Sequence, residues 1–121
     1  MAMRVVNLEE KAGLVKELHK YKLIAQVNDM QFKLVKAKRT FVWHSHEDTD
    51  EMFFLVEGSM ILETRDKAFH LNKGEMIVVP KGVEHRPVCE TECTVMLVEP
   101  AGTVNTGNAG GAMTDMELTW I

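Results

Sequence analysis

Residues 44–58 read HSHEDTDEMFFLVEG, and residues 74–85 read GEMIVVPKGVEH. In the first stretch, histidines and acidic residues stand between two apolar runs. A polar turn between strands needs only Gly, Asn or Pro, which supply turn geometry without placing imidazoles beside carboxylates. The histidines in this position therefore indicate a functional site rather than a simple loop.

The chain has 121 residues, of which 45% are hydrophobic and 26% are charged. A chain of this length buries roughly two thirds of its unfolded surface on folding, so we expect a single domain over residues 1–121. No apolar run approaches the roughly 18 residues of a membrane span, and the first residues lack the apolar core of a signal peptide. The sequence therefore predicts a cytoplasmic protein with no membrane partner.

The net charge is −4 at pH 7. Basic residues are scattered except within residues 33–39, where no aromatic residues are interleaved for base stacking. We therefore expect no nucleic-acid partner. The two cysteines, Cys89 and Cys93, are predicted to be free thiols, because a reducing compartment disfavours a disulfide.

Residues 8–20 are predicted to form one amphipathic helix. Asn7 is a favourable N-cap with Glu10 three residues later, so the two side chains can satisfy the free backbone amides of the first turn. Apolar residues recur at helical spacing from Leu8 to Leu18, which predicts a stripe that packs against the rest of the molecule.

Strand-like runs follow the helix. Residues 21–27 and 31–37 flank an Asn-Asp turn, which predicts a hairpin. Further runs, separated by turn residues, cover residues 40–46, 51–57, 59–64, 67–71, 75–79, 84–88 and 93–98. Many short strands behind a single helix predict a barrel or a sandwich.

Residues 101–115 read AGTVNTGNAGGAMTD and contain four glycines. The segment offers little that would anchor it in a core, and it lacks the Lys-Ser/Thr ending of a phosphate-binding loop. We expect either a mobile flap or an inert surface tail. Residues 116–121 are expected to return as an edge strand, at a subunit contact.

The candidate metal ligands come from both stretches. In an extended strand alternate side chains share a face, so His44 and His46 should point the same way, roughly 6.5 Å apart. Glu51 begins the next run, where an antiparallel return brings its carboxylate to the same face. His85 begins a later run, directly after the turn at residues 80–82. Three imidazole nitrogens and one carboxylate suit iron, manganese, nickel, cobalt or zinc better than calcium or magnesium.

The two stretches resemble the two motifs of the cupin family. The first motif is matched by His44, His46, Glu51 and Gly58, and the second by Gly74, Pro80, Gly82 and His85. The resemblance implies an all-β fold, an antiparallel jelly-roll β-barrel over residues 21–100 with one N-terminal α-helix. It also implies one divalent transition metal ion per chain, held by these three histidines and the glutamate with coordination positions left open.

The chain departs from the family pattern at two positions. Lys38 stands where the first motif usually opens with Gly, and Cys89 stands where the second often closes with Asn. Neither position is a metal ligand in the family, so the departures affect the loop geometry and the pocket lining.

Other residues are assigned ordinary structural roles. His19 and His70 are expected to be surface or core histidines without a ligand role. Trp43, Arg86 and Glu99 are not assigned to the site, and strand alternation points the first two away from it. Solvated turn positions are Glu47, Asp48 and Asp50. The main core candidates, some of which should line the pocket, are Met52, Phe53, Phe54, Leu55, Met60, Leu62, Met76, Val78, Met96 and Val98.

The resemblance implies a metal-dependent enzyme acting on a small polar molecule, either an isomerase or epimerase or an oxygenase, with catalytic residues unknown. Small cupins of this kind resemble mannose-6-phosphate isomerase. A phosphate would need clustered basic residues, however, and the motif region offers only Arg65, Lys81 and Arg86.

Two alternatives stay open beside the enzyme. The first is a non-catalytic module that binds a metal or a small ligand, and the second is a scaffold with a vestigial site, which the intact ligand set disfavours. An enzyme should carry a further ionisable group with a shifted pKa inside the barrel. We also expect a small-molecule partner and a homodimer, because the helix and first strands add apolar area beyond that of a minimal barrel.

Overall fold

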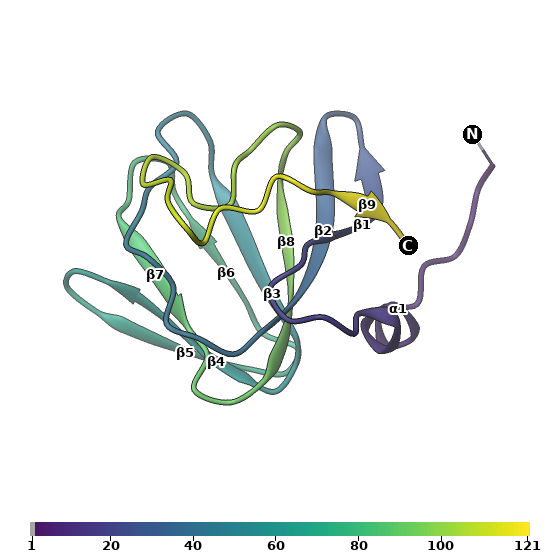
Figure 1. The fold of residues 1–121 in the computed structure, drawn as a ribbon, viewed down its shortest axis with the longest axis horizontal. Coiled ribbons are helices and arrows are strands. Elements are labelled where there is room, and N and C mark those ends of the chain that lie inside the picture. The colour runs from purple at the N-terminus through teal and green to yellow at the C-terminus, as the bar shows by residue number, and fades with distance from the viewer. Residues whose placement is uncertain (1) are drawn as a thin grey trace.

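The structure is a computed structural model that describes residues 2–121. Within this range, a short helix, α1 (Leu8–Leu14), precedes nine strands (Figure 1). The strands are β1 (Lys22–Val27), β2 (Met30–Ala37), β3 (Glu51–Glu57), β4 (Ser59–Thr64), β5 (Ala68–Asn72), β6 (Met76–Val79), β7 (His85–Val88), β8 (Cys93–Pro100) and β9 (Thr119–Trp120).

The strands form two sheets. The larger has the order β6-β3-β8-β2-β1-β9 and the smaller the order β5-β4-β7. Neighbouring strands are antiparallel except for β1 and β9, which run parallel. The two sheets pack face to face as a jelly-roll β-barrel, so the predicted all-β fold with an N-terminal α-helix is confirmed.

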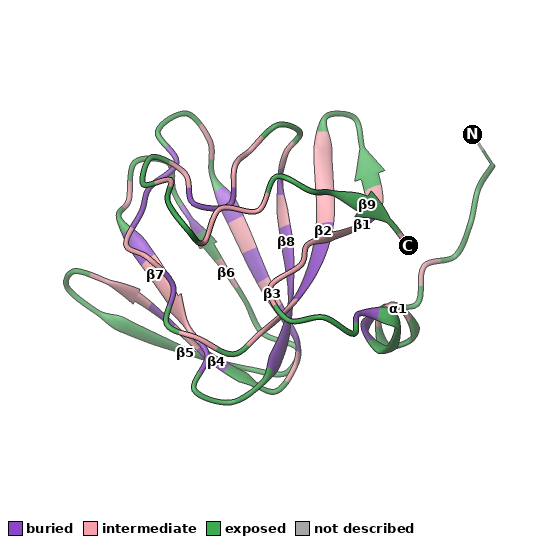
Figure 2. Cartoon of the chain, in the orientation of Figure 1, coloured by how far each residue is buried: buried purple, intermediate pink, exposed green. Residues whose placement is uncertain are grey.

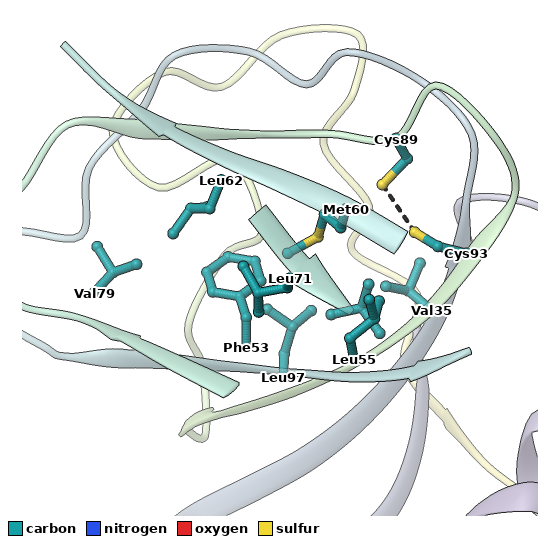
Figure 3. Close-up of a cluster of buried hydrophobic side chains, with 11 residues drawn as sticks. Val35, Phe53, Leu55, Met60, Leu62, Leu71, Val79, Cys89, Cys93 and Leu97 are labelled. Atoms are coloured by element: carbon teal, nitrogen blue, oxygen red, sulfur yellow. Dashed lines mark hydrogen bonds between the residues drawn. The ribbon is translucent and has the colours of Figure 1, made fainter. Parts of the chain in front are cut away.

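Strand alternation builds the barrel interior. In β3 the side chains of Phe53 and Leu55 point into the core, and in β8 those of Val95 and Leu97 do the same. Figure 3 shows Phe53, Leu55 and Leu97 among the apolar side chains gathered between the two sheets. The same alternation carries Glu51, two residues before Phe53, to the inward face at the start of β3, where it is buried.

A second buried cluster lies on the outer face of the larger sheet. Ala12 of α1 and Val15, directly after it, pack with Leu34 of β2 and Met96 of β8. Figure 2 shows the buried side of the helix turned toward the sheet. Because these apolar side chains are buried between the helix and the sheet, the helix is held against the outer face of the sheet.

The predicted helix over residues 8–20 is too long, because α1 ends at Leu14. Asn7 does cap the helix as expected, with its Oδ1 accepting from the amide of Glu10 at 2.9 Å. Val15 is already extended, and the chain then runs beside β2, where the amide of His19 donates to the carbonyl of Lys36 at 2.7 Å. Pairing with the C-terminal end of β2 therefore replaces further helical turns.

The predicted strand over residues 40–46 is also wrong. Only isolated bridges occur there, between Thr40 and Val88 and between His44 and His85. The segment faces β7, which contains Pro87; the amide of Phe41 donates to the Pro87 carbonyl at 3.0 Å. Proline has no N–H to return, so a continuous ladder cannot form.

Two of the predicted core residues, Met76 and Val78, are exposed. They lie on the edge strand β6, where alternation turns Val79 into the core and leaves these two side chains on the outer face. The apolar side chains of β6 therefore lie both on its core-facing side and on its exposed outer side. The first hairpin and the strands after Glu51 lie where they were predicted, within one or two residues at their ends.

The Gly-rich segment, residues 101–115, is neither helix nor strand, but the expectation that it lacks an anchor is wrong. Asn105 and Thr106 are buried. The side-chain amide of Asn105 donates to the carbonyl of Met113, and its Oδ1 accepts from the amide of Asp115, both at 2.9 Å. These hydrogen bonds within the segment stabilise its conformation.

The chain then returns as β9, which pairs with β1 and supplies the expected edge strand over part of residues 116–121. Figure 1 shows the C-terminal segment, in yellow, crossing the barrel before it reaches β1. Among the described residues, no helix has the length and apolar character needed to cross a membrane.

Candidate metal centre

The four predicted ligands converge inside the barrel. His44, His46, Glu51 and His85 are all buried, and one ligand atom from each lies within 4.8 Å of the others. Such a group can hold a single metal ion. All four residues that the sequence predicts as ligands therefore lie in one cluster, although two of them lie on a segment that is not a regular strand.

Main-chain hydrogen bonds bring the two motifs together. The amide of His44 donates to the carbonyl of His85 at 3.0 Å, and the amide of His85 donates back at 2.8 Å. The carbonyl of His46 accepts from the amide of Gly82 at 2.8 Å, and Asp50 accepts from the amide of Lys81 at 2.9 Å. Each histidine of the cluster is thus tied to the turn or strand of the other motif.

Backbone carbonyls also fix the ring orientations. Nδ1 of His44 lies 2.9 Å from the carbonyl oxygen of Val42, and Nδ1 of His85 lies 2.9 Å from that of Val83. A carbonyl oxygen only accepts, so each Nδ1 carries the proton and donates. In the neutral imidazole the lone pair is then on Nε2, which is the arrangement that orients a metal-binding histidine.

The donor atoms of the cluster need a cation between them. Oε1 of Glu51 lies 3.1 Å from Nε2 of His85 and 3.4 Å from Nε2 of His46, and the latter atom is buried without a hydrogen-bond partner. A lone pair on Nε2 of His85 faces an acceptor oxygen, so either a proton or a metal ion must lie between them. Three nitrogens and one carboxylate oxygen fit a divalent transition metal ion.

The electrostatics favour the metal-binding protonation states. Burial lowers the pKa of His44 to about 4, with its His85 and His46 neighbours acting in the same direction, so its imidazole is neutral at pH 7. Burial alone would raise the pKa of Glu51, but the neighbouring imidazoles of His46 and His85 outweigh burial and hold that pKa well below its usual range. Glu51 is therefore a carboxylate, as a ligand must be.

A cavity of about 40 Å³ reaches the cluster at His44 and Glu51. Its wall is mostly apolar and includes Phe41, Phe53 and Leu97. The remaining polar or ionisable residues of the wall are His19, Tyr21, Arg39, Cys89, Glu99 and Asn105. An apolar wall with a few polar groups is typical of a small-molecule site.

Glu99 is the second buried carboxyl group of this interior. Its Oε1 accepts from Nζ of Lys33 at 3.0 Å, while its Oε2 is buried without a partner. Burial and the neighbouring negative charge of Glu51 raise the pKa of Glu99 well above its usual range, and Lys33 offsets only part of this effect. Tyr21, also in the wall, has a raised pKa because of its burial.

Sequence reasoning left several wall residues out of the site. The sequence pattern does not assign Glu99 to the site, although its position two residues after the inward-facing Leu97 indicates that its side chain points inward. Tyr21, Arg39 and Asn105 belong to three distant parts of the chain, and nothing in their local sequence indicates that they converge. His19 was assigned an ordinary role, and it does accept from the amide of Lys38 at 3.1 Å while lining the cavity.

The residues predicted to point away do so. The guanidinium groups of Arg65 and Arg86 lie over the ring of Trp43, at 3.9 and 4.8 Å from its centroid. Arg86 also donates to Glu63 at 2.7 Å. His70 is exposed on β5 of the smaller sheet and is not part of the cluster.

The chain belongs to the cupin family, because residues 31–99 match the model of the Cupin domain. This family assignment agrees with the jelly-roll fold and with the buried group of three histidines and one glutamate.

The chain is also similar to individual proteins. The chain is similar to the crystal structure of a cupin-2 domain containing protein from Shewanella frigidimarina, with 47% identity and a TM-score of 0.77 over 79% of this chain and 94% of that one. A protein from Neisseria meningitidis is 34% identical, with a TM-score of 0.73 over 81% of this chain and 100% of that one. The uncharacterized protein YdbB of Bacillus subtilis is 34% identical over 84 residues, which are 69% of this chain and 74% of its own.

Proposed function

We propose that this protein is a metal-dependent cupin enzyme that acts on a small polar molecule. The observation that carries the proposal is the convergence of His44, His46, Glu51 and His85 beside a cavity. These residues would hold one divalent ion, iron, manganese, nickel, cobalt or zinc. Such an ion would supply Lewis-acid chemistry toward a substrate oxygen or a water molecule, and iron would add redox chemistry with dioxygen.

The groups beyond the ligands favour an enzyme over a simple binder. The ionisable side chains of Glu99 and Tyr21 line the same cavity, and neither belongs to the ligand set. An isomerase or epimerase needs a group that gives or takes a proton beside the bound substrate. We propose Glu99 for that role, because it lines the cavity and its Oε2 is buried without a partner within the described residues.

A sugar phosphate of the mannose-6-phosphate isomerase type is a weaker candidate for the substrate. Among the described residues that line the cavity, Arg39 is the single basic residue with a permanent charge, and no lysine is present. A phosphate dianion is usually bound by several such groups. We therefore favour a smaller polar molecule.

The mostly apolar wall of the cavity supports the non-catalytic alternative. Such a wall binds a ligand through complementary shape and dispersion contacts and needs no catalytic group. Under this alternative, the metal and the cavity would be present but no substrate would be converted.

Metal analysis tests the proposal. Protein purified without an affinity tag or chelator is compared with a His44→Ala/His46→Ala double variant by plasma mass spectrometry. His70→Ala is the matched control, because it removes an exposed histidine on β5. We expect about one transition metal per chain in the wild type and in His70→Ala, and none in the double variant.

Equal and near-zero metal in all three proteins after reconstitution would contradict the metal site. If metal is bound, its identity selects the activity assay. Iron directs the assay to oxygen consumption, and zinc or manganese directs it to isomerase and epimerase substrates.

A further inference from the structure

Arg39 is a cation of the cavity wall whose side chain makes no hydrogen bond or ion pair with any of residues 2–121. Its backbone carbonyl accepts from the amide of Cys89 at 2.9 Å, which fixes the residue opposite the end of β7. Nε of the guanidinium is buried without a partner. Arg39 as a whole is half-buried, but its buried Nε–H is a costly donor to leave without an acceptor, and a ligand in the cavity would supply one.

The position of the guanidinium is set by an aromatic contact. Its central carbon lies 5.0 Å from the centroid of the Phe41 ring, so the ring supports the cation without satisfying its N–H groups. The Phe41 ring in turn lies 5.2 Å from that of His44. The Phe41 ring therefore lies between Arg39 and the candidate metal ligand His44, and all three residues line the same cavity.

The other charged groups near Arg39 are already engaged. Oδ2 of Asp115 accepts from the amide of Tyr21 at 3.2 Å, and Oδ1 accepts from the amide of Glu117 at 3.1 Å. Glu99, across the cavity, is paired with Lys33 at 3.0 Å. Neither carboxyl group lies within ion-pair distance of Arg39.

We infer that the molecule bound in this cavity is a small carboxylate, whose charged group pairs with Arg39 in the wall that also contains His44 and Glu51. The inference rests on the proposed function insofar as the cavity is a substrate site. A planar carboxylate with one negative charge matches the fork of a single guanidinium. A neutral sugar would offer Arg39 only uncharged hydroxyl acceptors, and a phosphate dianion would be only partly neutralised.

The test uses small carboxylates and their uncharged amides. Acetate, propionate and lactate are titrated against zinc-loaded protein, and acetamide, propionamide and lactamide serve as neutral probes of the same shape. Inorganic phosphate is the dianionic probe. Heteronuclear NMR follows the Nε–H resonance of Arg39, which a purely structural residue would not shift on addition of ligand.

We expect at least one carboxylate to shift this resonance and to bind roughly tenfold more weakly to Arg39→Gln. Arg39→Lys keeps the charge but not the fork, and we expect an intermediate loss. Arg65→Gln is the matched control, because Arg65 is exposed and pairs with Glu84 on the surface. Its carboxylate binding should equal that of the wild type.

The inference is overturned if no carboxylate binds, if the amides bind equally well, if phosphate binds in preference, or if Arg39→Gln binds carboxylates as the wild type does. The metal content of Arg39→Gln separates this outcome from a failure of the metal site. Arg39-dependent carboxylate binding by a protein that takes up no metal would support the inference and contradict the proposed function.

Discussion

The main chains of His44 and His85 exchange two hydrogen bonds, with N–O distances of 3.0 and 2.8 Å, and their rings lie 4.3 Å apart between centroids. The spacing of these two candidate ligands is therefore set by the backbone. Removing one imidazole leaves the main chain that positions the other intact, so single-ligand variants should fold.

Burial of His44 should make the stability of the metal-free protein depend on pH. Its pKa is about 4 in the folded state and 6.5 when exposed. Between these values the unfolded chain binds more protons, so stability falls as the pH falls through this range. The loss amounts to at most about 3 kcal/mol for such a shift.

Urea unfolding in the presence of a chelator, at several pH values, measures this effect. We expect the stability of the wild type to fall more steeply than that of His44→Gln between pH 6.5 and 4. Glu99 has a raised pKa and acts in the opposite direction, but it is present in both proteins. Parallel pH profiles would refute the assignment of this slope to His44.

Gly107 should be essential for the shape of the metal cluster. Its φ is +52°, and a Cβ at this position would clash with the carbonyl oxygen of Ser45, between His44 and His46. We expect Gly107→Ala to destabilise the protein by about 2 kcal/mol or more and to lower its metal content.

Gly110→Ala is the control for this substitution. Gly110 has a φ of +62°, so alanine meets the same backbone penalty, but a Cβ added there would have no atom within 4 Å. Thermal unfolding and metal analysis of both variants separate the clash from the conformational cost. Equal losses in the two variants would exclude a specific role for the Gly107–Ser45 contact.

We propose that the protein is a homodimer that uses the outer face of the larger sheet. Met76 and Val78 are exposed on β6, beside the half-buried Met52 and Phe54 of β3. Light scattering at micromolar concentration should give the mass of two chains, and Val78→Lys should reduce it to that of one, because it buries a charge in the contact. A monomeric wild type would rule out the dimer.

Cys89 and Cys93 should behave as buried thiols. Sγ of Cys93 donates to Sγ of Cys89 at 2.9 Å, and the two side chains lie between the sheets (Figure 3). With exposures of 3% and 1%, they should react with a thiol reagent only as fast as the protein opens. We expect slow labelling of the native protein and rapid labelling of two thiols in urea; rapid native labelling would show that this corner of the barrel is open.

The predictable part of the site depends on local pattern. The two histidines one residue apart, the glutamate before an apolar run and the histidine after a Pro-Lys-Gly turn could all be read from the sequence. Alternation within β3 then places Glu51 on the same side as Phe53, and the structure agrees. These features can be predicted because each depends only on residues that are close together in the sequence.

The less predictable part depends on contacts between distant segments. Pro87 breaks the ladder opposite residues 40–46, although those residues themselves are typical of a strand. The helix ends at Leu14 because the chain that follows it pairs with β2. The apolar residues of that following chain continue the helical spacing, so the sequence pattern alone predicts a longer helix. Arg39 and Asn105 line the same cavity although they are distant in the sequence, and no local sequence pattern predicts this contact.

The Gly-rich segment does more than cover the barrel. Asn108 accepts from the amide of Ser45 at 2.9 Å, and its own amide donates to the carbonyl of Ser45 at 3.1 Å. Asn105, in the same segment, lines the cavity. Lifting the segment to admit a molecule would thus loosen the chain between His44 and His46. Entry of the substrate and dissociation of the ion should then share a kinetic step, so that a bound ligand slows the loss of metal.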